Sequence, residues 1–451
     1  MGMFEKIRRF FRSREIKETP EAAEGAMAGA NVHAGFAYRR TTEGMSAFDL
    51  AKDAAAEALK RVGSENFSVA LVYSAYEHNP KDVAAGVSAA IPGPWLGCTT
   101  SGEITSAGLF EDSIVVAAIS SPRIKFGIGV SSGVCQDDEG AGKTAINMAL
   151  KSLTAKGGAM KEGANFIIMH GSTGGEEGII RGLQQEVGNI PVVGGTAGNA
   201  LTENPPYVFA NGKAYTDAVV LGLMSSDMVT VVDSGHGWKS TGKVGLVTRS
   251  NPPEERKTTL WHKVYTIDNR PAAEWYAEQI SALKGSEVSV DTLKQYYPFV
   301  TFGGSSGIGG TGYPTGIKDP QGRIWTRDVH SVEDDLGLTF WAYVPEGTGL
   351  EVLEGTPDTL TDRSKASAKD LFSKYSKFKP VMMFDFNCVG RKIYLSKVNK
   401  LDGEYEEIKK LIKGTPIVGF YTHGEQACYG GLNQHCNLTI TRLLITDTLA
   451  T

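Results

Sequence analysis

An internal repeat constrains the fold of this chain more than any other sequence feature. Three segments, residues 69–119, 166–223 and 381–445, share one order of elements. Each begins with a short apolar β-rich run, which an intervening segment follows. That segment has a helical pattern in at least two copies, and it leads to a Pro-x-[Leu/Val]-Gly turn and a small polar loop. Another apolar β-rich run follows each loop. Three strand–helix–strand copies predict α/β sheets built from crossovers and covered by helices, and their unequal spacing excludes a solenoid.

Length and composition narrow the class of protein. The 451 residues are too many for one compact core and suit two or three domains. With 41% hydrophobic and 22% charged residues, the composition is that of a globular protein, and the net charge of -5 gives no sign of nucleic-acid binding. Five cysteines without a regular spacing favour a reducing compartment. We find no membrane-spanning run and no signal peptide, so we expect a cytoplasmic protein.

Changes in composition divide the chain into three parts. Residues 1–29 form a basic amphipathic tail and a linker, residues 30–250 a first α/β domain, and residues 251–451 a second. The tail has two interpretations, a helix lying on an anionic membrane surface or a solvated extension. The boundary near residue 250 falls in a polar, charged and turn-rich stretch.

Glycines and acidic residues recur at equivalent places in the repeat. A glycine closes each Pro-x-[Leu/Val]-Gly turn, and a second glycine follows four or five residues later; the pairs are Gly97 and Gly102, Gly194 and Gly198, Gly419 and Gly424. Glu103 and Glu425 follow in the first and third copies, where the second has Asn199. Glycine at a strand end permits close approach of a ligand or of a neighbouring strand. These glycines could therefore lie beside a bound ligand or could serve only the close packing of neighbouring strands.

Several ordered stretches resemble the FIST sensory module, with its N- and C-terminal domains. The stretch most typical of the N-terminal domain is PWLGCTTSGEI at 94–104. In the second half the similar stretches are HKVYTIDNRPAAEWY at 262–276, VPEGTGLEVLEG at 344–355, FDFNCVGR at 384–391 and TPIVGFYTHGEQA at 415–427, with Asn-x-Thr at 437–439. The resemblance covers nearly the whole chain from about residue 30 to 446.

The resemblance implies a ligand-binding sensor rather than an enzyme. Amino acids are proposed ligands of the family, and some members bind haem and respond to nitric oxide. Members are often fused to histidine kinase, cyclase or chemoreceptor parts. We find no such output segment in this sequence, so we expect the signal to pass in trans to a partner of that kind.

Arg391, Glu425 and Cys388 are the first candidates for ligand binding. Cys388 and Arg391 follow an apolar strand directly, and Glu425 follows the neighbouring one. An arginine can hold a carboxylate through two parallel hydrogen bonds, and a glutamate can accept an ammonium group. The two charged residues would therefore suit a zwitterionic amino acid held between the two halves of the chain. A structural ion pair between Arg391 and Glu425 is the alternative.

Ser101 and Glu103 form the corresponding candidates in the first half, beside Cys98. A nucleophilic role for Cys98 or Cys388 would make the protein a thiol-dependent enzyme. No cationic neighbour in the sequence lowers the pKa of Cys98, so we expect a buried, unreactive thiol there. A scaffold docked to a membrane or a partner through the basic tail is a further alternative.

Histidines and cysteines are dense near the C-terminus. His423, Cys428, His435 and Cys436 lie close together, but their spacing fits no zinc motif, and adjacent residues of a strand point to opposite sides. We therefore expect no metal site. Haem without a covalent link leaves no sequence motif, so a haem-based gas sensor using His423 or His435 remains an alternative.

Overall fold

The structure is a computed structural model of the full chain. It describes residues 31–63, 67–158, 166–172, 174–199, 204–252, 262–296, 312–374 and 378–449. The tail and linker expected at residues 1–29 lie outside the described residues, and so does any contact of that tail with a membrane.

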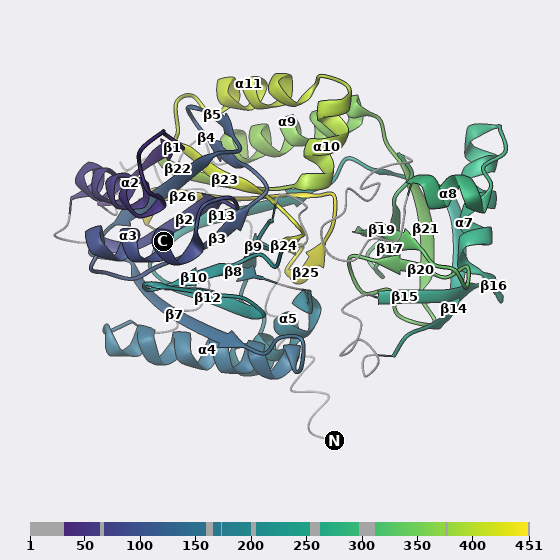
Figure 1. The fold of residues 1–451 in the computed structure, drawn as a ribbon, viewed down its shortest axis with the longest axis horizontal. Helices are drawn as coiled ribbons and strands as arrows, with labels where there is room; N and C mark the ends of the chain where they lie inside the picture. The colour runs from purple at the N-terminus through teal and green to yellow at the C-terminus, as the bar shows by residue number, and fades with distance from the viewer. Residues whose placement is uncertain are drawn as a thin grey trace, which may run out of the picture.

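Three units of one architecture form the body of the molecule (Figure 1). The first consists of β1 (His33–Arg40), α2 (Ala47–Val62), β2 (Phe67–Ala75), α3 (Pro80–Ala90), β3 (Trp95–Thr100), β4 (Glu103–Thr105), β5 (Gly108–Phe110) and β6 (Ser113–Ser120). The second consists of β7 (Lys125–Ser132), α4 (Asp138–Ala155), β8 (Phe166–Gly171), α5 (Glu176–Val187), β9 (Val192–Gly195), β10 (Val208–Ala210), β11 (Lys213–Tyr215) and β12 (Ala218–Ser225). The third consists of β13 (Met228–Gly235), α9 (Pro357–Lys374), β22 (Pro380–Cys388), α10 (Val389–Lys397), α11 (Leu401–Leu411), β23 (Ile417–Thr422), β24 (Glu425–Tyr429), β25 (Leu432–Cys436) and β26 (Ile440–Leu449).

Each unit builds a mixed sheet in the same way. Its two crossover strands run parallel, as β2–β3, β8–β9 and β22–β23 do, and its last strand pairs antiparallel with the first of them. Polar side chains cap α2, α3 and α4 at their starts; Ser46, for example, accepts a hydrogen bond of 3.1 Å from the Asp49 amide at the start of α2. The predicted fold class, mixed α/β sheets made from repeated strand–helix–strand units, is confirmed.

Hairpins pass from one unit to the next around the body. The hairpin β4–β5 pairs with β23 of the third unit, β10–β11 pairs with β3 of the first, and β24–β25 pairs with β9 of the second. Each sheet is thus completed by strands from another unit. The exchange is cyclic, so the three units form a closed body with an approximate threefold arrangement.

A single hydrophobic core lies between the three sheets. Alternate residues of the central strands face it, among them Leu71 on β2, Ile168 on β8 and Phe384 on β22, and all three are buried. Burial of each such side chain contributes about 1.5–3 kcal/mol relative to exposure. The alternate residues face the covering helices, with α2 and α3 on one sheet, α4 and α5 on another, and α9, α10 and α11 on the third (Figure 1).

A separate domain is inserted between β13 and α9 of the third unit. It contains β14 (Lys239–Ser250), β15 (His262–Ile267), β16 (Arg270–Pro271), α7 (Ala272–Lys284), α8 (Val290–Tyr296), β17 (Thr315–Lys318), β18 (Ile324–Arg327), β19 (Val329–Val332), β20 (Leu338–Phe340) and β21 (Gly349–Glu354). Its described strands pair antiparallel around a core of their own. In Figure 1 it is the lobe on the right.

The boundary expected at residue 250 falls inside this inserted domain. β14 ends at Ser250 and pairs with β15, which begins at His262. Strands from both halves of the chain also share the body, since β4, β5 and β13 lie in one sheet with β22, β23 and β26. The third repeat unit is needed to close the body with the first two, so the body includes segments from both ends of the chain. The structure therefore divides into this body and the inserted domain at residues 239–354.

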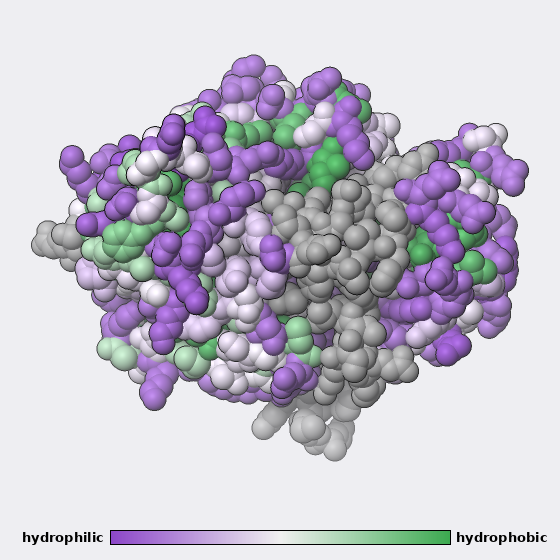
Figure 2. Space-filling view, in the orientation of Figure 1, coloured by the Kyte–Doolittle hydropathy of each residue, from purple (hydrophilic) through white to green (hydrophobic). Residues whose placement is uncertain are grey.

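The described helices include none that is long and apolar enough to cross a membrane. The face of the molecule seen in Figure 2 is dominated by hydrophilic residues, with apolar ones scattered among them.

Candidate functional site

The polar loops that follow β3, β9 and β23 meet at one end of the body. Backbone hydrogen bonds join them in a ring, from the Ser101 amide to the Tyr421 carbonyl (3.1 Å), from the His423 amide to the Thr196 carbonyl (3.1 Å), and from the Gly198 amide to the Thr99 carbonyl (2.8 Å). The inserted domain contacts this end of the body. The strand-end loops of the repeat are therefore brought together where the two parts of the molecule meet.

Packing explains the first glycine of each pair. A Cβ atom added to Gly97 or Gly419 would lie 1.8 Å from a carbonyl oxygen of the neighbouring parallel strand, and one added to Gly194 would lie 2.1 Å from the corresponding oxygen. Side chains are excluded at all three places because the strands approach too closely. Gly97, Gly194 and Gly419 therefore serve the close packing of neighbouring strands, rather than the approach of a ligand.

Glu103 and Glu425 occupy equivalent, fully buried positions and bind the protein itself. The Glu425 carboxylate accepts hydrogen bonds from the Thr439 amide (3.0 Å) and hydroxyl (2.6 Å) and from the Thr422 hydroxyl. Glu103 accepts the same three kinds of bond from Ser113 and from the Thr100 hydroxyl. Burial raises the pKa of each carboxyl to about 7, against the lowering effect of these donors. Both glutamates fasten a hairpin to the strand that follows it.

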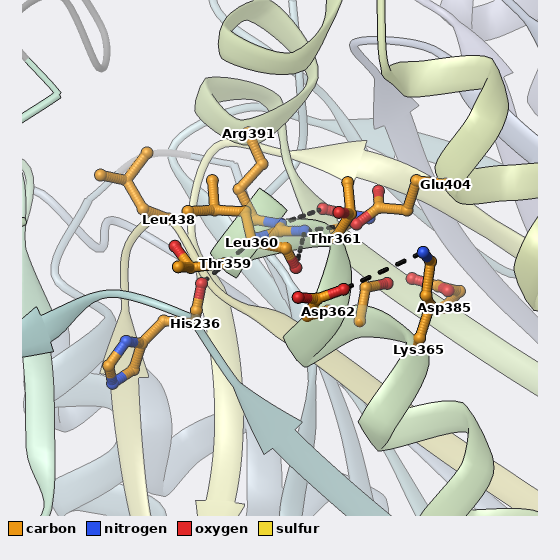
Figure 3. A network of polar contacts seen from close by, with 12 residues as sticks. His236, Thr359, Leu360, Thr361, Asp362, Lys365, Asp385, Arg391, Glu404 and Leu438 are labelled. Atoms are coloured by element: carbon orange, nitrogen blue, oxygen red, sulfur yellow. Dashed lines mark hydrogen bonds and ion pairs between the residues drawn. The ribbon is translucent and has the colours of Figure 1, made fainter. Parts of the chain in front are cut away.

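Arg391 does not pair with Glu425, and this corrects the expected charge arrangement. Its guanidinium, 0% exposed, binds the Glu404 carboxylate at 2.7 Å. It also donates to the Asn387 side chain (3.1 Å) and to the carbonyls of His236 (3.2 Å) and Leu360 (3.4 Å), as Figure 3 shows in part. Arg391 lies in the first turn of α10, so its side chain points back under the covering helices. The group joins α9, α10 and α11 and leaves no guanidinium face for a ligand.

The cysteines are poorly suited to nucleophilic chemistry. Burial raises the thiol pKa of Cys98 and Cys388 well above the ordinary value. The thiol pKa values of Cys135, Cys428 and Cys436 are raised to about 12, 11 and 12, with burial as the first cause. Cys98 is buried, as predicted, and Cys388 shares that environment, while the lack of reactivity stays a prediction. Since the thiolate is the reactive form, these values argue against a thiol-dependent enzyme.

The contact between the body and the inserted domain contains a buried polar group around Glu177. Glu177 lies in the first turn of α5, and its Oε1 accepts a hydrogen bond of 2.8 Å from the Tyr343 amide of the inserted domain. Its Oε2 is buried and has no hydrogen-bond partner among the described residues, with His262 Nε2 at 3.9 Å. Burial would raise the pKa of Glu177, but His435, His262 and Arg327 outweigh it and lower the pKa to about 2. We call these four residues the junction cluster.

Arg327 supplies the permanent positive charge of the junction cluster. It is 5% exposed; its Nε donates to the Tyr343 carbonyl (2.8 Å), and its Nη1 donates to the carbonyls of Thr326 (2.9 Å) and His435 (3.2 Å). Among the described residues Nη2 has no hydrogen bond, and no carboxylate forms an ion pair with this guanidinium. A buried cation and a buried anion therefore lie near each other without contact.

A chain of buried side chains leads from the junction cluster into the ring of loops. The Thr196 hydroxyl donates to Glu176 Oε1 at 2.6 Å, and Gln426 Nε2 lies 3.1 Å from the same hydroxyl and 3.3 Å from His435 Nδ1. Gln426 is 0% exposed, and its Oε1 has no hydrogen-bond partner in the described part of the chain. Buried polar atoms normally find partners, so two unpaired oxygens in one region indicate a place for a polar molecule.

The remaining sequence candidates also lie at this end of the body. Ser101 Oγ is 2.8 Å from His423 Nε2. His435 is 1% exposed and packs so tightly that a Cβ on Gly424 would lie 2.3 Å from its Cε1. The haem interpretation would use these two histidines; Nε2 of His423 is taken by Ser101 and the His435 ring is enclosed by protein, and haem binding stays a prediction. The described residues contain no group of three or more His, Cys, Asp or Glu side chains placed to hold a metal ion.

The sequence interpretation missed Glu177 and Arg327. The sequence held a signal for Glu177, which is the last residue of Gly-Gly-Glu-Glu and follows the apolar strand 166–171. Arg391, the last residue of FNCVGR, follows the equivalent strand of the third copy in the same way. The same strand-end reasoning would have selected Glu177. Nothing comparable marked Arg327, since only the docking of the inserted domain brings it to the body.

Comparison with known proteins decides the family. The chain matches the FIST N domain over residues 68–270 and the FIST C domain over residues 272–428. The chain belongs to the FIST family. FIST domains are sensory domains of signal-transduction proteins, so this FIST protein belongs to a sensor family rather than to a family of enzymes.

Individual relatives add little about the ligand of this FIST protein. An uncharacterized protein of Methanocaldococcus jannaschii is 22% identical over 374 residues, which are 77% of this chain and 67% of that protein. Among solved structures, a cyanuric acid hydrolase from A. caulinodans matches 45% of this chain and 76% of its own at 10% identity, with a TM-score of 0.27. The PurL protein of T. maritima matches 94% of this chain and 74% of its own at 9% identity, with a TM-score of 0.21. Likeness this low carries no argument about fold or function.

Proposed function

We propose that this FIST protein is a sensor that binds a small zwitterionic ligand, such as an amino acid, at the junction cluster. The observation that carries the proposal is the Glu177 carboxylate. Its Oε2 is buried, accepts no hydrogen bond among the described residues and lies 3.9 Å from His262 Nε2, and the nearby Arg327 makes no hydrogen bond there through Nη2. A buried carboxylate oxygen that accepts no hydrogen bond is costly, and a ligand that supplies the missing donor would complete the arrangement.

The two charges match the two ends of an amino acid. Glu177 would accept the ammonium group, and Arg327 would donate to the carboxylate. Gln426, through its unpaired Oε1, would accept one further hydrogen bond. These residues take the roles that the sequence analysis gave to Glu425 and Arg391.

Binding at this place offers a route to a signal. Glu177 and Gln426 belong to the body, whereas Arg327 and the Tyr343 amide belong to the inserted domain. A ligand that contacts both parts favours the arrangement in which they lie together, and the population shift is limited by its difference in affinity for the two arrangements. A partner protein, such as a histidine kinase, a cyclase or a chemoreceptor component, would read that arrangement.

Isothermal titration calorimetry tests the proposal. Each common amino acid is titrated into the wild-type protein and into Glu177→Gln and Arg327→Met. Loss of a charged hydrogen bond costs about 1.5–3 kcal/mol, so we expect binding of the best ligand to weaken about 10-fold to 150-fold in each variant. Glu186→Gln is the matched control, since Glu186 lies on the same helix, is exposed, and binds only Asn147 among the described residues. Equal affinity of all four proteins would contradict the proposal.

A further inference from the structure

A serine and a histidine from two different units face each other at the end of the body. Ser101 and His423 occupy the same place in the loops after β3 and β23, directly before a glycine of positive φ. Ser101 Oγ lies 2.8 Å from His423 Nε2. Equivalent residues that come this close must lie near the approximate threefold axis. In the second unit Gly198, four residues after Gly194, lies at the same place.

The surrounding backbone holds the pair in position. The Ser101 amide donates to the Tyr421 carbonyl at 3.1 Å, and the Ser101 carbonyl accepts from Lys392 Nζ at 2.8 Å. A Cβ on Gly198 would lie 2.5 Å from the Ser101 hydroxyl, so only glycine leaves room for that hydroxyl. Among the described residues, His423 is the only side chain that Ser101 Oγ contacts by a hydrogen bond. The hydroxyl and the imidazole are thus oriented before any ligand arrives.

The protonation state of His423 allows it to accept the hydroxyl proton. Burial lowers the pKa of His423 to about 4, so the imidazole is neutral at ordinary pH, and the same burial makes it a weaker base than a free imidazole. Activation of the serine requires the tautomer with the ring hydrogen on Nδ1, in which Nε2 accepts from the serine hydroxyl. The Lys392 ammonium, which donates to the Ser101 carbonyl, also forms an ion pair with Glu111. Ser101 retains 6% exposure and His423 is partly exposed, so the pair is not sealed from reagents.

We propose that Ser101 is a nucleophile activated by His423 and that it accepts an acyl group from a carboxylic ester. The Oγ–carbon bond forms as the bond between the carbonyl carbon and the alcohol oxygen breaks. The hydroxyl proton moves to His423 Nε2 and then to the departing alcohol oxygen. Water, activated by the same imidazole, then releases the acid and restores Ser101.

The proposed nucleophile and the proposed sensor site are neighbours but are independent. The His423 amide donates to the Thr196 carbonyl, and the Thr196 hydroxyl belongs to the buried chain that leads to the junction cluster. Ser101→Ala leaves Glu177 and Arg327 untouched, so it should bind amino acids like the wild type. A failure of acylation would therefore leave the sensor proposal standing, and the reverse also holds.

Labelling with a fluorophosphonate probe, followed by intact mass measurement and peptide mapping, tests the proposal. We expect one adduct per chain, located on Ser101, and none in Ser101→Ala. General-base assistance is worth about 100-fold to 10,000-fold, so His423→Gln should label at least about 100-fold more slowly. Ser106→Ala is the control; Ser106 lies in the following hairpin and accepts from the Ile417 amide, so its removal should leave labelling unchanged.

A pH profile of the wild type gives a readout that needs no variant. The labelling rate should be constant near neutrality and fall as pH drops through about 4, where His423 becomes protonated. No adduct on Ser101 would overturn the proposal. Equal labelling rates in the wild type and a folded His423→Gln, or a rate that stays constant down to pH 3, would overturn it as well, since the pair would then be only a structural hydrogen bond.

Discussion

Two buried charge groups of this protein contrast in how completely they are satisfied. Under the covering helices, the Arg391 guanidinium binds Glu404, Asn387 and two backbone carbonyls, and it has no exposed surface. At the junction, Glu177 and Arg327 lie near each other, yet no ion pair joins them, and Glu177 Oε2 has no hydrogen-bond partner among the described residues. Burial of charge is common to both groups. Only the junction, where Glu177 Oε2 lacks a hydrogen-bond partner among the described residues, points to a ligand. The number of hydrogen-bond partners of a buried charge therefore distinguishes a structural ion pair from a binding site.

The largest effect on stability should come from breaking the satisfied pair. Arg391→Met leaves Glu404 buried without its cation and should lower the free energy of unfolding by about 3–5 kcal/mol. Urea denaturation followed by circular dichroism measures the change. The double variant with Glu404→Leu should recover much of the loss, because apolar side chains can replace a buried ion pair. A loss below about 1 kcal/mol in the single variant would show that the pair is not structural.

The junction should respond more weakly. Glu177→Gln removes the charge that His435, His262 and Arg327 favour but keeps an acceptor for the Tyr343 amide, so the free energy of unfolding of the ligand-free protein should fall by about 1–2 kcal/mol, less than in Arg391→Met. Thermal unfolding without and with amino acids measures both effects. The wild type should gain stability from ligand and Glu177→Gln should gain little. A large loss of stability in the ligand-free variant would make Glu177 a structural residue like Glu404.

The buried glutamates of the hairpins should make stability depend on pH. Glu103 and Glu425 have pKa values raised to about 7, above the ordinary 4.5, so the folded state holds their protons more tightly than the unfolded state. Their contribution is complete below about pH 4.5 and is lost as pH rises to about 7, with a slope of about 1.4 kcal/mol per pH unit for each proton. Glu425→Gln should remove one such slope between pH 4.5 and 7. Identical pH profiles of variant and wild type would contradict this.

The smallest effect is expected at the thiols. Cys388→Ala removes one buried sulfur and should lower stability modestly, by about 1 kcal/mol, without changing amino-acid affinity. Iodoacetamide should leave Cys98 and Cys388 unmodified in the folded protein and modify both in urea, as mass spectrometry will show. Rapid modification of Cys388 in the folded chain would restore it as a candidate site residue.

The repeat in the sequence predicted the strands and loops of the body well, because the spacing of apolar residues, the residues of a turn and the positions of glycine are local properties of the sequence. The strands at 69–75, 166–170 and 381–387 and the loops after Gly97, Gly194 and Gly419 lie where the pattern placed them. The cyclic exchange of hairpins was not predictable, since it depends on which sheet edge each hairpin meets after folding. The boundary placed at residue 250 coincides with the end of β14, because turn-rich composition marks loops rather than the closure of a core.

Charge pairing was harder to predict than secondary structure. Arg391 and Glu425 follow the neighbouring strands β22 and β23 along the chain. An arginine in the first turn of a helix follows the helix direction, and this points Arg391 toward Glu404 on α11. Glu177 follows a predicted strand, so the sequence could have indicated it as a candidate. Arg327 lies 150 positions away in the inserted domain, and no local sequence pattern predicts how that domain docks on the body. Long-range contacts of this kind depend on tertiary structure and are not visible in sequence spacing.

Hydrogen–deuterium exchange of the full-length protein, with and without a mixture of the common amino acids, tests the central claim most directly. If the junction cluster binds the ligand, protection should appear in peptides covering the start of α5, residues 324–343 and the hairpin β24–β25, and exchange in α10 and α11 should stay unchanged. Protection centred on Arg391 and α11 with none at Glu177, or no protection at any of these peptides, would contradict the account.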